Sequence, residues 1–186
     1  MEWIEKIDFF ILDWIQQNLK GELLDFLMPI VTMLGDGGIF FVLLSLALLC
    51  TKKYRKQGSS LLGGLFLCLL FGNLLLKPLF ARIRPYDLVE GFQLLIKPLS
   101  DYSFPSGHTM ASFACAGVFW HYRKAFGKWS AAAIAAAVLI GFSRLYLYVH
   151  FPTDVLCGAL LGLLFAAVSV RLNERIFARK AKTVGK

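Results

Sequence analysis

Three groups of residues between positions 77 and 154 together supply cations, histidines and a carboxylate that could form an active site. They are Lys77 with Arg84; Ser106, Gly107 and His108; and Arg144, His150 and Asp154. Arginine binds phosphate through parallel hydrogen bonds, and three fixed cations suit a multiply charged oxyanion. The residue types therefore predict a phosphate-binding site that contains Lys77, Arg84 and Arg144.

The segment Phe104-Pro105-Ser106-Gly107-His108 predicts a second part of this site. Proline is favoured where a helix begins, and the first backbone N–H groups of a helix have no partner within it. A helix that starts here would leave the N–H groups of Ser106 and Gly107 free to bind phosphate.

His108 and His150 supply groups that can transfer a phosphoryl group. Histidine titrates near about 6.5, so one neutral imidazole can attack phosphorus while a second, protonated, donates to the departing oxygen. Asp154 follows His150 by four residues, and its carboxylate would accept the imidazole N–H and fix the tautomer. Taken singly, these residues also fit snorkelling cations, a helix cap and satisfied polar side chains.

The full arrangement resembles the phosphatidic acid phosphatase type 2 superfamily of membrane lipid phosphatases. Three ordered motifs carry the resemblance, and all eleven of their positions are filled without substitution. They are Lys77 and Arg84-Pro85; Pro105-Ser106-Gly107-His108; and Ser143-Arg144, His150 and Asp154.

The resemblance implies a role for each residue. His150 would be the nucleophile, Asp154 its partner and His108 the general acid. The residues that hold phosphate would be Lys77, Arg84, Ser106, Gly107 and Arg144. It also implies a covalent phosphohistidine intermediate, with no metal and no other cofactor, and Ser143 is expected to support helix packing.

The composition predicts an all-α, integral-membrane protein. Of 186 residues, 58% are hydrophobic and 17% charged, and a mean hydropathy of +0.64 excludes most water-soluble classes. Since a membrane span uses about 20 apolar residues, the runs predict a six-helix bundle in which a turn at Gly35–Gly38 joins the first two helices as a hairpin. The runs are 21–34, 38–50, 59–80, 106–121, 129–148 and 152–170.

A single domain is expected over residues 1–186. Its parts are a six-helix core over 21–170 and a basic tail over 171–186, preceded by an amphipathic helix over 1–20. This first helix would either lie in the membrane interface or pack against the bundle.

Basic residues predict the orientation in the membrane. Thirteen of the 20 lysines and arginines fall within 52–56, 123–128 and 171–186. Because short cytoplasmic loops are rich in such residues, these segments and both termini are expected in the cytoplasm. The 81–104 loop and the phosphate site would then lie outside, and the net charge of +8 needs no nucleic acid to explain it.

The expected substrate is a phosphorylated lipid, with the lipid bilayer as the other partner. The chain is similar to compact bacterial members of the family that act on undecaprenyl diphosphate. Phosphatidylglycerophosphate, phosphatidate and diacylglycerol diphosphate remain alternatives. A transporter or flippase that binds a phosphate head group without cleaving it would explain the cations but not the two histidines. The sequence predicts no oligomeric state.

Overall fold

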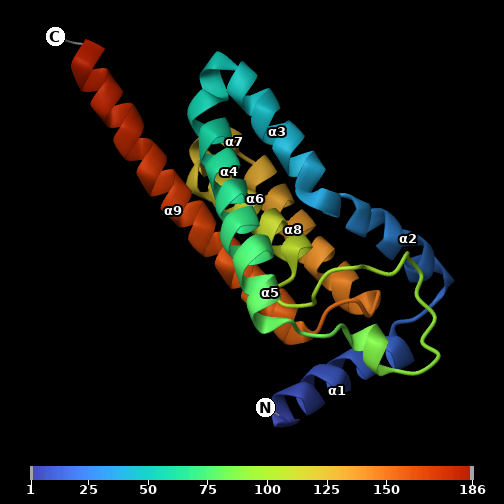
Figure 1. Ribbon diagram of the computed structural model, residues 1–186. Coiled ribbons are helices and arrows are strands. Elements are labelled where there is room, and N and C mark those ends of the chain that lie inside the picture. The colour runs from blue at the N-terminus through green and yellow to red at the C-terminus, as the bar shows by residue number, and fades with distance from the viewer. Residues whose placement is uncertain (1, 185–186) are drawn as a thin grey trace.

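The computed structural model describes residues 2–184 and contains only helices and connecting segments over that range (Figure 1), which confirms the all-α prediction. The π-helix Cys68–Leu76 (η3) joins α4 to α5, and the 3-10 helices are Asp36–Gly38 (η1), Lys52–Tyr54 (η2) and Pro85–Leu88 (η4). The α-helices are α1 (Glu2–Asn18), α2 (Glu22–Met33), α3 (Ile39–Cys50), α4 (Arg55–Leu67), α5 (Lys77–Phe80), α6 (Gly107–His121), α7 (Arg123–Phe126), α8 (Trp129–Tyr146) and α9 (Pro152–Val184).

Helix α6 is the centre of the bundle and packs against α4, α8 and α9. Glycines allow α9 to come close, since a Cβ at Gly158 would lie 2.7 Å from the carbonyl oxygen of Ser106. The backbones are also joined directly, because the Ser106 N–H donates to the Asp154 carbonyl oxygen at 3.2 Å. This close contact holds the first turn of α6 beside the first turn of α9.

The 81–106 and 147–151 connections lie at one end of the bundle, which we call the loop end (Figure 1). Turn η1 reaches the same end, since Asp36 contacts His108 at the start of α6. The connections at 51–54 and around α7 lie at the other end. All three sequence motifs therefore meet at the loop end.

The predicted hairpin of 21–34 and 38–50 is wrong. Helix α2 packs against α8 instead of folding back along α3 (Figure 1). The Tyr146 hydroxyl donates to Asp25 at 2.6 Å, and Arg144 donates to Thr32. Since these long-range bonds hold α2 to the loop end, α2 and α3 form one bent path through the bundle.

Four helical stretches are long and apolar enough to cross a membrane: Glu22–Cys50, Lys52–Leu88, Trp129–Tyr146 and Pro152–Arg179. The chain is therefore a membrane protein. The expected count of six crossings is not confirmed, because α2 and α3 share one stretch and α6 has only 15 residues, fewer than the about 17 that a span requires.

The two ends of the chain also differ from the prediction. Helix α1 lies at the loop end, whereas α9 continues to Val184 and ends at the opposite end (Figure 1). The expected basic tail is thus part of α9 as far as Val184, and residues 185–186 lie outside the described range. Placing both termini on the cytoplasmic side depended on the hairpin, and the structure does not support it.

Candidate active site

His150 lies in the short connection between α8 and α9 and is fully buried. Its Nε2 is 3.3 Å from Arg84 Nη1, and its Nδ1 is 3.4 Å from Ser103 Oγ. Because a guanidinium can only donate, we assign the lone pair to Nε2 and the proton to Nδ1. Burial, followed by the charges of Arg84 and Arg144, holds the pKa of His150 well below its ordinary value. The imidazole is therefore neutral, with Nε2 available as a base.

Asp154 lies in the first turn of α9, behind His150, and is also buried. Its Oδ2 accepts from Ser103 Oγ at 2.5 Å and from the Phe151 N–H at 2.9 Å. The distance from Oδ2 to His150 Nδ1 is 3.7 Å, too long for the direct hydrogen bond that the sequence predicted. The Ser103 hydroxyl bridges the two groups instead, because it donates to Asp154 and faces the proton on Nδ1.

Lys77 and Arg84 come from the chain that leaves the bundle at the loop end. The wide turns of η3 precede Lys77, and Ala81 ends α5 with a φ of 44°. Arg84 then donates through Nη1 to the Val149 carbonyl oxygen at 2.7 Å. These contacts hold Arg84 against the connection that carries His150.

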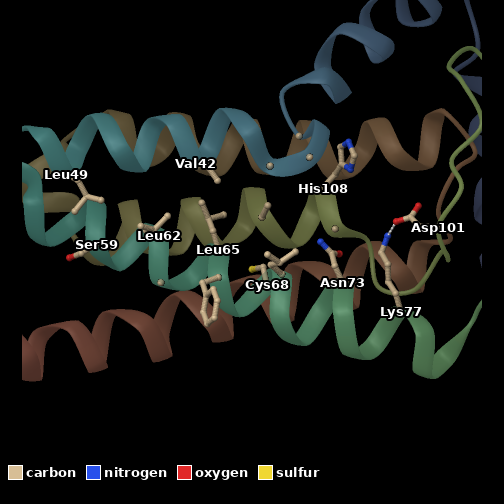
Figure 2. A pocket seen from close by; sticks show the side chains of 18 residues that line it. Val42, Leu49, Ser59, Leu62, Leu65, Cys68, Asn73, Lys77, Asp101 and His108 are labelled. Carbon is tan, nitrogen blue, oxygen red and sulfur yellow. Dashed lines mark hydrogen bonds and ion pairs between the residues drawn. The ribbon is translucent and has the colours of Figure 1, made fainter.

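A carboxylate that the sequence analysis missed bridges these two cations. Asp101 accepts from Arg84 Nη2 at 2.6 Å and forms an ion pair with Lys77 (Figure 2). Burial raises the pKa of Asp101, but the hydrogen bond and charge of Lys77, with those of Arg84, lower it to about 2. An anionic group therefore already lies between two of the three predicted phosphate ligands.

Arg144, in the last turn of α8, is buried with most of its hydrogen-bonding capacity unused. Its Nη1 donates to Thr32, whereas its Nε and Nη2 are buried and have no partner. Unsatisfied buried donors are costly, and most so on a charged group. This guanidinium is therefore suited to bind an anion that enters the site.

The start of α6 differs in part from its predicted arrangement. The Ser106 N–H is not free for phosphate, because it donates to the Asp154 carbonyl oxygen, and the Ser106 hydroxyl caps the helix. His108 pairs with Asp36 of η1, with 2.8 Å between Nε2 and Oδ1. Only a glycine fits at position 35, because a Cβ there would lie 2.5 Å from the His108 ring.

A cavity of about 780 Å³ opens between these groups. Its lining includes six of the eight predicted site residues, namely Lys77, Arg84, Gly107, His108, Arg144 and His150. The other two, Ser106 and Asp154, are fully buried and support this lining from behind.

Ser143 donates to the Ile140 carbonyl oxygen of its own helix at 2.7 Å. In the part of the chain that the structure describes, no cluster of three or more histidine, cysteine, aspartate or glutamate residues could hold a metal.

Several polar residues that the sequence analysis did not single out also contact the predicted ones. Arg82 lies two residues before the motif residue Arg84 in the sequence, and this proximity is a usable signal. Asp36 and Thr32 are far from every motif, so no spacing indicates them. These residues are Thr32, Asp36, Arg82, Asp101, Ser103 and Thr109.

The model of the PAP2 superfamily matches residues 57–178, about two thirds of the sequence. The chain belongs to this superfamily. The match includes all three motifs and leaves α1, α2 and α3 outside.

Named relatives and solved structures agree with this membership. The undecaprenyl-diphosphatase of Sulfolobus acidocaldarius is 34% identical over 128 residues, 68% of this chain and 60% of that protein. Phosphatidylglycerophosphatase B of Bacillus subtilis is 34% identical over 164 residues, 81% of this chain and 70% of that protein. The crystal structure of Aquifex aeolicus LpxE superposes with a TM-score of 0.76 at 30% identity, covering 89% of this chain and 95% of LpxE.

Proposed function

We propose that the chain is a metal-independent lipid phosphatase that hydrolyses undecaprenyl diphosphate to undecaprenyl phosphate and phosphate. One observation carries the proposal. A neutral, buried His150 lies at a cavity that also contains the unpaired N–H groups of Arg144. A nucleophile beside an unfilled anion site suits phosphoryl transfer, and membership of the PAP2 superfamily supports it.

The reaction proceeds in two steps. His150 Nε2 attacks the terminal phosphorus, the bond to the bridging oxygen breaks, and His108 donates a proton to that oxygen. The proton on His150 Nδ1 faces the Ser103 hydroxyl, which donates a hydrogen bond to Asp154. Water, deprotonated by His108, then attacks the phosphohistidine, which releases phosphate and restores both imidazoles. Lys77, Arg84 and Arg144 hold the phosphate oxygens throughout, with the backbone at Gly107.

An apolar groove supports a lipid substrate. It starts at Lys77, Asp101 and His108 and runs between α3 and α4 to Leu49 and Ser59 (Figure 2). Its volume is about 780 Å³. The side chains along it include Val42, Leu62, Leu65, Phe66 and Leu69. This apolar groove suits the isoprenoid tail of undecaprenyl diphosphate, with the diphosphate at the cations.

The proposal predicts phosphate release by the purified chain in detergent with EDTA present. Undecaprenyl diphosphate should give the highest kcat/KM, by about tenfold or more, over phosphatidylglycerophosphate, phosphatidate and diacylglycerol diphosphate. A higher kcat/KM for one of these lipids would replace the substrate assignment. Tight binding without release of phosphate from any of them would favour a transporter or flippase, and activity lost in EDTA but restored by a metal would contradict the metal-independent mechanism.

We also propose that the cavity faces the extracytoplasmic side. The basic segments at 52–56 and 123–128 and the last turns of α9 lie away from the loop end, and basic residues favour the cytoplasm. Helix α1, at the loop end, buries Leu12 and exposes Trp3, Phe10 and Trp14. This arrangement suits a helix that packs on the bundle with one side and lies in the interface of the extracytoplasmic leaflet with the other.

Single cysteines test this orientation in a background that lacks the four native ones. On intact cells, a membrane-impermeant thiol reagent should label Gln93→Cys in the loop and Gln17→Cys in α1. Lys52→Cys should react only after the membrane is opened. All three positions have exposed side chains, so access to the reagent depends on the side of the membrane. Labelling of position 52 alone, in an active protein, would place the site in the cytoplasm.

A further inference from the structure

Asp8 of α1 is a buried carboxylate that no motif includes and that lies outside the matched family region. Its Oδ1 accepts from the Thr153 N–H at 3.0 Å, and its Oδ2 accepts from Thr153 Oγ1 at 2.5 Å. Oδ2 also accepts from Arg82 Nη2 at 2.8 Å. Three hydrogen bonds thus hold the Asp8 carboxylate beside Thr153, the residue that precedes Asp154.

Arg82 links Asp8 to Asp154. Its Nη1 donates to Asp154 Oδ1 at 2.6 Å and to Thr153 Oγ1 at 2.7 Å. The guanidinium carbon lies 3.9 Å from the centre of the Phe151 ring. One cation is therefore shared between two fully buried carboxylates, and hydrogen bonds run from Asp8 through Arg82, Asp154 and Ser103 towards His150.

We propose that Asp8 is a positioning residue for phosphoryl transfer, which balances the charge of Arg82 so that Asp154 keeps a net negative charge for His150. The inference rests on the proposed function. Asp8, Arg82 and Asp154 together carry one negative charge, and the imidazole becomes cationic when it attacks phosphorus. Without Asp8, the remaining pair is neutral and stabilises that cation less.

The surroundings of His150 make this charge important. The groups near its ring that are cationic or can become so are Lys77, Arg84, His108 and Arg144. The carboxylate of Asp101 is bound between Lys77 and Arg84, so it offsets those charges. Among the residues that the structure describes, Asp154 provides the carboxylate that lies within 4 Å of the His150 ring. Its effective charge therefore has a direct influence on both the basicity and the reactivity of His150.

Asp8→Asn should lower kcat by about 10–100-fold and leave KM for p-nitrophenyl phosphate nearly unchanged, because no phosphate ligand is altered. The acid limb of the pH profile of kcat/KM reports deprotonation of His150. It should move to lower pH by about half a unit to one unit, since losing a carboxylate disfavours the cation. A matched control is Asp13→Asn, because Asp13 of the same helix accepts from the Tyr148 hydroxyl at 2.7 Å and lies outside this network.

The double variant Asp8→Asn/Arg82→Gln separates charge balance from packing. It removes both charges and leaves Asp154 negative, so it should be more active than Asp8→Asn alone, with its acid limb back towards the parental pH. A purely structural role for Asp8 predicts a lower melting temperature, an unshifted acid limb and a further loss in the double variant, and that result would overturn the proposal. If the parental chain releases phosphate and Asp8→Asn matches it, this inference alone fails. If the parental chain releases none, the proposed function fails and this inference fails with it.

Discussion

His150→Ala should lower phosphate release by about 10⁴-fold or more, for lipid and aryl substrates alike. The loss is independent of the leaving group because Nε2 forms the new bond to phosphorus in every case. The matched control is His121→Ala, because His121 is exposed, lies 3.4 Å from Glu174 and ends α6, whose first turn carries His108. The control should turn over at the parental rate. Appreciable phosphate release by His150→Ala would show that another group attacks phosphorus.

His108→Ala provides the contrast in the same assay. A general acid contributes about 10²–10⁴-fold when the leaving oxygen needs a proton. The alcohol expelled from a lipid phosphate monoester such as phosphatidate is a poorer leaving group than p-nitrophenolate, so the variant should lose more activity on phosphatidate than on the aryl ester. Equal fractional losses, with chemistry rate-limiting for both substrates, would remove His108 from that role.

Arg144→Met should change activity and stability in opposite directions. Activity should fall by about 10²–10³-fold, since a donor to the transferring phosphoryl group is lost. The free energy of unfolding should rise by about 1–3 kcal/mol, because a buried charge with two unpaired nitrogens is replaced by an apolar side chain. Thermal unfolding in detergent measures the second effect and a phosphate assay the first.

A ligand experiment adds a check on Arg144. Orthovanadate, an analogue of phosphate, should raise the melting temperature of the parental chain and leave that of Arg144→Met almost unchanged. Arg175→Met, at an exposed position of α9, should behave as the parental chain does. Equal stabilisation of all three proteins by vanadate would mean that Arg144 does not bind the phosphate.

Much of the helical structure could be predicted because the apolar runs are long and end at charges or glycines. The run 106–121 became Gly107–His121, and 129–148 became Trp129–Tyr146. The apolar runs do not show whether the chain folds back on itself at Gly35–Gly38. A local glycine turn shows where a chain bends, whereas the direction of α2 depends on bonds to α8 such as Asp25–Tyr146, more than 100 residues away in sequence.

The same distinction applies to the site. Lys77, Arg84 and Arg144 stood out because a charge within an apolar segment is costly and needs a function. Asp101 and Ser103 did not stand out, because polar residues are common in a loop and their spacing predicts no contact. Ser103 bridges His150 and Asp154 because His150 Nδ1 and Asp154 Oδ2 lie 3.7 Å apart, too far for a direct hydrogen bond. The spacing of the two residues in the sequence does not determine this distance.

Trapping the phosphoenzyme tests directly whether His150 is the nucleophile. Purified chain is mixed with substrate radiolabelled at the terminal phosphate, quenched under denaturing alkaline conditions, and digested for peptide mapping. A phosphohistidine at position 150 predicts a label that is stable in base and labile in acid, on the peptide that contains His150, and absent from His150→Ala. Two results would contradict His150 as the nucleophile. One is normal release of phosphate by the parental chain with no trapped label under single-turnover conditions, and the other is a label on another residue.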